Sequence, residues 1–155
     1  KHKVTHIFAV PMVWNTIAKE ITKEISSRDE KTQKRFDKGI KLSNKLQNIW
    51  PSLGLYITRK LMSEVQNKIF GNTIKFLITG GGYISQSTIE LINGIGYPLY
   101  NGYGMSEIGI TSVELRKKIK YRNLSTIGKP LPTVEYKIED EKFFVLKETA
   151  FYFLF

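Results

Sequence analysis

The fold of this chain is constrained most by a run of apolar, β-branched residues that leads directly into three glycines and then into a helical pattern. Residues 74–79 form the clearest strand pattern, Gly80–Gly82 follow at once, and residues 85–93 have the composition of a short helix. A second strand pattern, at 97–100, ends at Asn101 and is again followed by glycines. Ligands of open α/β sheets bind beyond the carboxyl ends of the strands. The sequence therefore predicts two glycine-bearing loops at the same edge of one sheet.

The stretch Asn101-Gly102-Tyr103-Gly104-Met105-Ser106-Glu107 gathers groups suited to a nucleotide. Glycine has no Cβ, so it permits positive φ and the close approach of a bound group. Tyr103 lies between two glycines and offers a planar ring, while Ser106 and Glu107 add a hydroxyl donor and a carboxylate. Mg²⁺ typically takes one or two protein carboxylates together with phosphate oxygens. The stretch predicts a site for a base, a phosphate and a divalent cation. The alternative is a tight turn that exposes a tyrosine.

Other classes of catalytic site find little support. Gly80–Gly82 fit neither G-x-G-x-x-G nor the phosphate loop G-x-x-x-x-G-K-[ST], and a triple glycine is often an ordinary loop. The chain has no cysteine, which excludes disulfides and thiolate metal sites. Its two histidines, His2 and His6, lie at the N-terminus, far in sequence from the candidate serines. No Ser/His/Asp set can therefore be assembled.

Three helices are expected between a first strand at 4–10 and the strand at 74–79. They are predicted at 14–26, from near Asp29 to 49, and at 56–69, with Gly54 in the connection before the third. In the short helix at 85–93, Ser87 and Glu90 fit a capping box. The residues expected to face inward from the second and third helices are Phe36, Ile40, Leu46, Ile49, Leu61, Met62, Val65 and Ile69, and Trp14 and Trp50 are expected to be core anchors.

The C-terminal third has the pattern of strands and turns. Residues 108–113 are predicted to be a strand, and the basic run 114–122 to be helix or loop. A rigid turn is expected at 128–132, followed by a strand at 134–138 that pairs with 143–146. The last six residues are apolar and contain no charge or proline, which makes them an aggregation hazard if exposed. The native chain is therefore expected to continue here or to have been truncated out of context.

The positive charge is concentrated in the first half. The formal net charge is +10; residues 1–75 hold 15 Lys and Arg against 6 Asp and Glu, whereas residues 76–155 hold 9 against 8. A basic half can meet nucleic acid, anionic lipid or an acidic partner, but it is more commonly a solvated helical face. The same alternatives apply to the basic run at 116–122. No apolar stretch approaches the roughly 20 residues of a membrane span.

With these motifs in order, the chain resembles the AMP-forming acyl-CoA synthetases of the adenylate-forming superfamily. The resemblance is carried by Gly80–Gly82, by Tyr103-Gly104-Met105-Ser106-Glu107, which fits the family signature Tyr-Gly-x-(Thr/Ser)-Glu, and by residues 127–132 before a strand. The opening at 4–11 is similar to a strand of the family that leads into a helix beginning with Val-Pro. The basic stretch 14–70 is similar to an extended segment found in the long-chain fatty-acid branch of the family. The resemblance extends to about residue 145.

The resemblance implies an α/β fold, a partial three-layer sheet-and-helix unit from the large N-terminal domain of an adenylate-forming enzyme. Within an incomplete AMP-binding domain over 1–155 it implies a basic helical segment at 14–70, a nucleotide-site core at 74–113 and a β-hairpin region at 127–146. The implied cofactors and substrates are ATP or AMP, Mg²⁺, CoA and a carboxylic acid, most specifically a long-chain fatty acid, with no covalent cofactor and no nucleic acid.

The resemblance also implies roles for residues. Tyr103 would stack on adenine, with the Gly80–Gly82 loop on the opposite face and lining the acyl pocket. Asn101 would contact the adenine amino group, Ser106 the α-phosphate, and Glu107 would ligate Mg²⁺. Ser106 and Glu107 are thus the implied catalytic residues, and the implied nucleotide-binding set is Gly80, Gly81, Gly82, Asn101, Gly102, Tyr103, Gly104, Met105 and Ser106.

Other parts of the family's machinery are not among the 155 residues. The Ser/Thr/Gly-rich phosphate loop, the Thr-Gly-Asp ribose motif and the lid domain with its lysine are missing, so the chain is expected to be an internal fragment without ligase activity of its own. Its expected location is the cytoplasm, with contact to a membrane surface. The alternatives are a non-catalytic basic module for nucleic acid or anionic membrane, and a degenerate relic.

Overall fold

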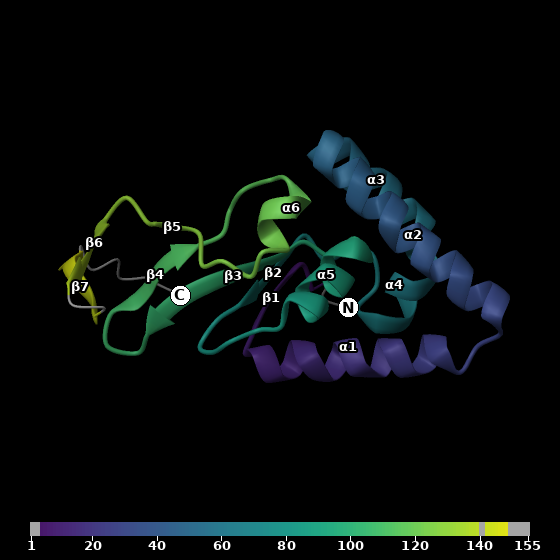
Figure 1. Cartoon of the computed structure of the whole chain (residues 1–155), viewed down its shortest axis with the longest axis horizontal. Helices are drawn as coiled ribbons and strands as arrows, with labels where there is room; N and C mark the ends of the chain where they lie inside the picture. The colour runs from purple at the N-terminus through teal and green to yellow at the C-terminus, as the bar shows by residue number, and fades with distance from the viewer. Residues whose placement is uncertain (1–3, 140–141, 149–155) are drawn as a thin grey trace.

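The computed structural model describes residues 4–139 and 142–148. Seven strands and six helices are described in these ranges, and Figure 1 shows the helices gathered toward one end of the molecule and the strands β6 and β7 at the other. In chain order the elements are β1 (His6–Ala9), α1 (Pro11–Ser26), α2 (Glu30–Ile49), α3 (Pro51–Leu61), α4 (Ser63–Ile69), β2 (Phe76–Thr79), α5 (Gln86–Gly94), β3 (Leu99–Met105), β4 (Gly109–Val113), α6 (Ile119–Arg122), β5 (Lys129–Pro130), β6 (Val134–Glu139) and β7 (Lys142–Glu148).

The main sheet has the strand order β1-β2-β3-β4-β5. Its first three strands are parallel, while β3–β4 and β4–β5 pair antiparallel. The parallel strands are joined through helices, as the strand–glycine–helix–strand pattern predicts, and the predicted α/β class is confirmed. The register places Ile7, Leu77 and Leu99 side by side on one face, and Phe8, Ile78 and Tyr100 on the other.

Helices cover the face of Leu77 and Leu99. Both side chains are fully buried in one apolar cluster with Trp14 of α1 and with Ile89 and Ile92 of α5. The indole of Trp14 also donates a hydrogen bond to the carbonyl oxygen of Ala9 at 3.0 Å, which fixes α1 to the end of β1. The opposite face is less covered, since Phe8 is 59% exposed.

A buried polar layer lies where α2 meets its neighbours. Ser43 and Gln47 are the buried residues of α2, and the expected inward position of Ile49 is wrong, because that side chain is 52% exposed. Gln47 donates to Ser43 and to the carbonyl oxygen of Asn93, and it accepts from Arg122 at 2.9 Å. The spacing of apolar residues along α2 did not predict the burial of Ser43 and Gln47. The small and polar groups that other elements bring to this contact determine which face of α2 is buried.

The region 50–69 differs from prediction in three ways. One helix was expected at 56–69, but α3 begins at Pro51 and the helix breaks at Met62 before α4. Gly54 lies inside α3, not in a connection, and packs on the backbone of α2. Trp50 is 58% exposed, so its expected core position is wrong, and so is that of Leu61, at 53%.

Two further boundaries are corrected. The N-cap of α5 is Ser85, which accepts from the backbone N–H of Thr88, so the predicted capping box of Ser87 and Glu90 is wrong. Strand β3 does not end at Asn101 but continues to Met105, because its glycine motif pairs with β4. The predicted hairpin of β6 with β7 is confirmed. The expectation for the C-terminal tail concerns residues 150–155, which lie outside the described residues.

Candidate functional site

A pocket of about 330 Å³ lies at the carboxyl ends of β1 and β2 and along β3. The glycine loop after β2 contributes Gly80 and Gly81 to its wall, and the second motif contributes every residue from Gly102 to Ser106. The two glycine motifs predicted to share one sheet edge therefore share one pocket. Its other lining residues are Phe8, Val10, Ile78, Thr79, Gly109 and Ile110.

Close backbone contact explains why glycine occupies these positions. A Cβ on Gly80 would lie 3.2 Å from the carbonyl oxygen of Gly102, so the two motifs touch through their main chains. Gly81 has φ of +80°, a conformation that side chains with a Cβ rarely adopt. The parallel pairing of β2 with β3 ends at Thr79 and Asn101, and this pairing brings the two motifs together.

The second motif is a hairpin. Residues up to Met105 lie in β3, residues 106–108 form a turn, and β4 returns from Gly109. The ladder shifts register between Tyr103 and Gly104. Because residues two apart in a strand point to the same face, Asn101 and Tyr103 lie on the side opposite Gly102. Ser106 and Glu107 are exposed in the turn.

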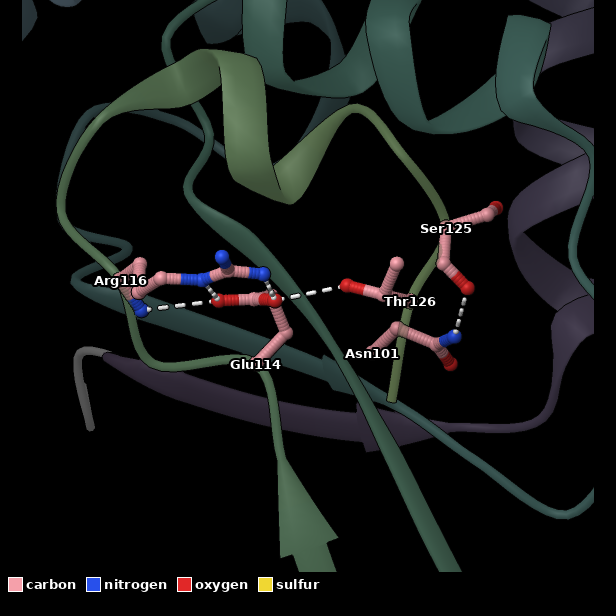
Figure 2. A network of polar contacts seen from close by, with 5 residues as sticks. All are labelled: Asn101, Glu114, Arg116, Ser125 and Thr126. Carbon is pink, nitrogen blue, oxygen red and sulfur yellow. Dashed lines mark hydrogen bonds and ion pairs between the residues drawn. The ribbon is translucent and has the colours of Figure 1, made fainter. Parts of the chain in front are cut away.

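Behind the hairpin lies a polar network that holds the segment 123–128 against β3 (Figure 2). Asn101 donates from its amide to the carbonyl oxygen of Ser125 at 2.8 Å. Glu114 accepts from Nε of Arg116 at 2.7 Å and from the hydroxyl of Thr126 at 2.7 Å. Ser125 has φ of +57°, and its hydroxyl donates to the carbonyl oxygen of Ile84. The network ties β3, β4 and the loop before α5 together.

Some buried oxygens on this side have no partner among the described residues. They are Oδ1 of Asn101 and the hydroxyl oxygens of Thr79 and Ser112. Thr79 and Asn101 are direct neighbours in the sheet register. A buried acceptor without a donor costs free energy, so a ligand that supplies a donor here gains binding.

The family model for AMP-binding enzyme matches residues 1–147. The chain belongs to the AMP-binding enzyme family.

Curated relatives match as well. Long-chain-fatty-acid–CoA ligase 2 of Schizosaccharomyces pombe is 28% identical over 141 residues, which are 88% of this chain and 20% of that protein. 2-Succinylbenzoate–CoA ligase of Lactococcus lactis subsp. lactis is 32% identical over 78 residues, which are 50% of this chain and 17% of that protein. The chain thus spans about a fifth of the length of these relatives.

Among solved structures, the ternary product complex of malonyl-CoA ligase with methylmalonyl-CoA and AMP is 15% identical to the chain. The TM-score is 0.45, and the match covers 93% of this chain and 24% of that one.

The structure brings most of the predicted site residues together. Those that line the common pocket are Gly80, Gly81, Gly102, Tyr103, Gly104, Met105 and Ser106. Gly82, Asn101 and Glu107 lie outside its lining. The amide of Asn101 is directed to Ser125. The roles given to these residues by family resemblance stay predictions.

The apolar wall of the pocket was missed by the sequence reasoning. Phe8 and Ile78 are paired in the β1–β2 register and point to the same face. Ile110 pairs with Gly104 in the hairpin. Each stands in a run that was predicted only as a strand, and the available signal was the alternation within those runs, which places every second residue on the far face.

Glu114→Gln is expected to remove an acid-sensitive part of the stability. Burial raises the pKa of Glu114, but the hydrogen bonds from Arg116 and Thr126 together outweigh it and hold the pKa below its ordinary value of 4.5. Because the folded-state pKa is depressed, the carboxylate stabilises the fold above pH 4.5 and loses this effect as the pH falls through the folded-state pKa.

Urea unfolding of the chain and its Glu114→Gln variant at several pH values measures this difference. We expect the original chain to be more stable by about 1–2 kcal/mol near neutral pH, since hydrogen bonds to a charged group are lost in the variant. The difference should shrink as the pH falls below 4.5. A difference that stays constant with pH would contradict the assignment.

Proposed function

We propose that this chain is the part of an ATP-dependent, AMP-forming acyl-CoA ligase that holds the acyl-adenylate, and that the acid is a long-chain fatty acid. The observation that carries the proposal is the pocket in which both glycine motifs meet, with Tyr103 and Ser106 in its wall. Family membership does not favour the alternative of a non-catalytic basic module.

The proposed reaction has two steps. An oxygen of the fatty-acid carboxylate attacks the α-phosphorus of ATP, the bond to the β-phosphate oxygen breaks, and pyrophosphate leaves. The thiol of CoA then attacks the acyl carbonyl carbon, loses its proton, and AMP leaves. Such chemistry depends on positioning and on neutralising phosphate charge. In this proposal Ser106 hydrogen-bonds the α-phosphate.

In this proposal adenine lies on the side of β3 that carries Asn101 and Tyr103, and the acyl group lies on the opposite face with Ile78, so the acyl-adenylate passes around the carboxyl ends of β2 and β3. Tyr103 offers a ring for stacking, and Asn101 lies two residues away on the same side of the strand. The Oδ1 atom of Asn101 is buried without a donor among the described residues, and the adenine amino group is a donor. This unpartnered oxygen supports the role proposed for Asn101.

A Mg²⁺ ion bound here would need phosphate oxygens of the nucleotide in addition to a protein carboxylate. Within residues 4–139 and 142–148 no group of three His, Cys, Asp or Glu residues is placed to hold a metal ion. Glu107 is an exposed carboxylate directly after Ser106. One carboxylate combined with phosphate oxygens is a usual environment for Mg²⁺, and the ion would supply neutralisation of phosphate charge.

The acyl group fits the apolar side of the pocket. Phe8, Val10, Ile78 and Ile110 line it, and the glycines leave its floor without side chains. A hydrocarbon chain is stabilised there by removal of apolar surface from water. The name of the fission-yeast relative supports a long-chain fatty acid, whereas the name of the bacterial relative points to an aromatic acid.

Calorimetric titration with sulfamoyl adenosines that mimic acyl-adenylates tests the proposal. We expect the hexadecanoyl analogue to bind at least about tenfold more tightly than the acetyl and 2-succinylbenzoyl analogues, because only its chain fills the apolar side. Ile110→Gln should weaken binding of the hexadecanoyl analogue but not of the acetyl and 2-succinylbenzoyl analogues. Leu115→Gln is the matched control, since Leu115 is a similarly exposed apolar residue outside the pocket.

Equal affinity for the three analogues would overturn the long-chain assignment. Absence of binding by every analogue, and by AMP, would overturn the role of the pocket itself.

A separate prediction concerns catalysis by the 155 residues alone. We expect no exchange of labelled pyrophosphate into ATP in the presence of palmitate and Mg²⁺, because the chain spans about a fifth of its relatives and the phosphate loop of the family is not in its sequence. Exchange that depends on both ATP and palmitate would show that the chain is catalytically sufficient.

A further inference from the structure

The helix α3 presents its apolar side to solvent. Its buried positions, Gly54 and Thr58, are small or polar and face α2. The apolar residues on its exposed side, together with the preceding Trp50, are Trp50 (58% exposed), Leu53 (52%), Tyr56 (56%), Ile57 (37%) and Leu61 (53%). Leu53, Ile57 and Leu61 recur every four residues and therefore form one stripe along the helix. Tyr56 lies at the edge of this stripe, and Trp50 directly precedes the helix.

The stripe continues onto α2. Arg59, on the other flank of α3, donates to the carbonyl oxygens of Ile74 and Gly96, so that flank faces the sheet and α5. The stripe lies on the opposite flank. On α2, Leu42 (47% exposed) and Ile49 (52%) lie four residues before and three residues after Leu46, whose backbone packs against Gly54 of α3, so they adjoin the stripe. Figure 1 shows α2 and α3 alongside each other, at the end of the molecule away from β6 and β7. We name these seven residues, from Leu42 to Leu61, the outer apolar stripe.

Basic side chains border the outer apolar stripe. Lys38, Lys41 and Lys45 are exposed on α2, within a turn of Leu42 or Ile49. On α3, Nζ of Lys60 lies 4.8 Å from the centre of the Tyr56 ring. Asp37 is the acidic residue of this part of α2, and the half of the chain up to residue 75 holds 15 basic against 6 acidic residues. The border is therefore positive.

We propose that the outer apolar stripe docks on the surface of an anionic membrane. Tryptophan and tyrosine favour the lipid–water interface, aliphatic side chains enter the acyl boundary, and lysines meet anionic headgroups. A nucleic acid would be bound by the lysines but would leave Leu53, Ile57 and Leu61 in water. No helix among the described residues is long and apolar enough to cross a membrane, and the proposed contact needs none.

The two tryptophans of the chain give a direct readout. Trp14 is fully buried against the sheet, whereas Trp50 lies in the stripe and is 58% exposed. Vesicles containing phosphatidylglycerol should shift the emission of Trp50 to shorter wavelength, and brominated acyl chains should quench it. Vesicles of phosphatidylcholine alone should have little effect. Trp50→Phe should remove the response, because Trp14 does not reach lipid.

Two sets of variants separate the apolar and charged contributions in vesicle sedimentation with the full chain. Leu53→Gln with Ile57→Gln should weaken binding to the anionic vesicles at least about tenfold. The matched control is Met12→Gln with Val13→Gln, which also removes two exposed apolar side chains from a helix but lies outside the stripe. Replacing Lys38, Lys41 and Lys45 by Gln should weaken binding about fivefold per lysine.

The proposal is overturned by any of four results. These are no binding of the full chain to anionic vesicles, equal binding by the stripe variant and its control, binding that ignores lipid charge, and a self-association that the stripe variant abolishes. Retention on heparin or nucleic acid that exceeds vesicle binding and is unaffected by Leu53→Gln with Ile57→Gln would assign the lysines to another partner.

Discussion

Gly104→Ala is expected to destabilise the chain by about 3 kcal/mol or more and to abolish binding of the acyl-adenylate analogue. A Cβ at this position would lie 2.8 Å from Cα of Ile110 and closer still to the carbonyl oxygen of Gly109. These are backbone atoms of the paired strand, so no side-chain rotation relieves the clash. The strands β3 and β4 would separate at the register shift beside Tyr103, which is the pocket wall.

Gly109→Asn is the matched control in the same hairpin. Gly109 has φ of +72°, which asparagine tolerates better than most residues, and its Cβ would meet no atom within 4 Å. The expected cost is about 1 kcal/mol. Gly109 also lines the pocket, so analogue binding is expected to fall, but less than in Gly104→Ala. Urea unfolding and calorimetric titration of both variants measure the two effects. Equal loss of binding in the two variants would mean that the close strand approach at Gly104 is not what shapes the pocket.

The second large effect is expected for Gly54→Ala, which should lower the free energy of unfolding by about 3 kcal/mol. The added Cβ would lie 2.5 Å from the carbonyl carbon and oxygen of Leu46 and 2.6 Å from the backbone nitrogen of Gln47. The helices α2 and α3 would have to move apart. That movement would also pull Gln47 from the buried guanidinium of Arg122, which is 4% exposed.

Gly39→Ala tests the same substitution in the partner helix. Its Cβ would meet the terminal methyl of Met62 at 2.5 Å, and this flexible group can rotate away. Alanine is better than glycine inside a helix by about 1 kcal/mol. Gly39→Ala is therefore expected to be neutral or stabilising, measured in the same urea unfolding experiment. Similar stabilities of the two variants would contradict the close helix crossing at Gly54.

These two glycines also show the limit of helical periodicity as a guide. The sequence places Gly39 within a helix, but it assigns Gly54 to a connection, because a glycine three residues after Trp50-Pro51 is typical of a turn. In the structure Pro51 begins α3, and Gly54 is the contact point of two helices. In the sequence, a proline at the first position of a helix and a glycine at a helix crossing resemble the proline and glycine of a loop.

The candidate site shows the same division. The order of strand, glycines, helix and strand was sufficient to predict that Gly80–Gly81 and Tyr103 meet at one sheet edge, since the carboxyl ends of neighbouring parallel strands coincide. It was not sufficient to show that Gly102–Met105 lie inside β3. Glycine disfavours strands, and only pairing with β4 makes the extended conformation stable here.

The sequence by itself determined the α/β class, the positions of most strands and helices, and the meeting of the two glycine motifs, because alternation, helical period and glycine are properties of consecutive residues. Only the tertiary structure decided which face of each element is covered. It buries Ser43, Gln47 and Arg122 and leaves Trp50, Leu53 and Ile57 exposed. Burial depends on what another element brings to the contact, and the glycine, hydroxyl and amide groups opposite α2 favour polar partners there.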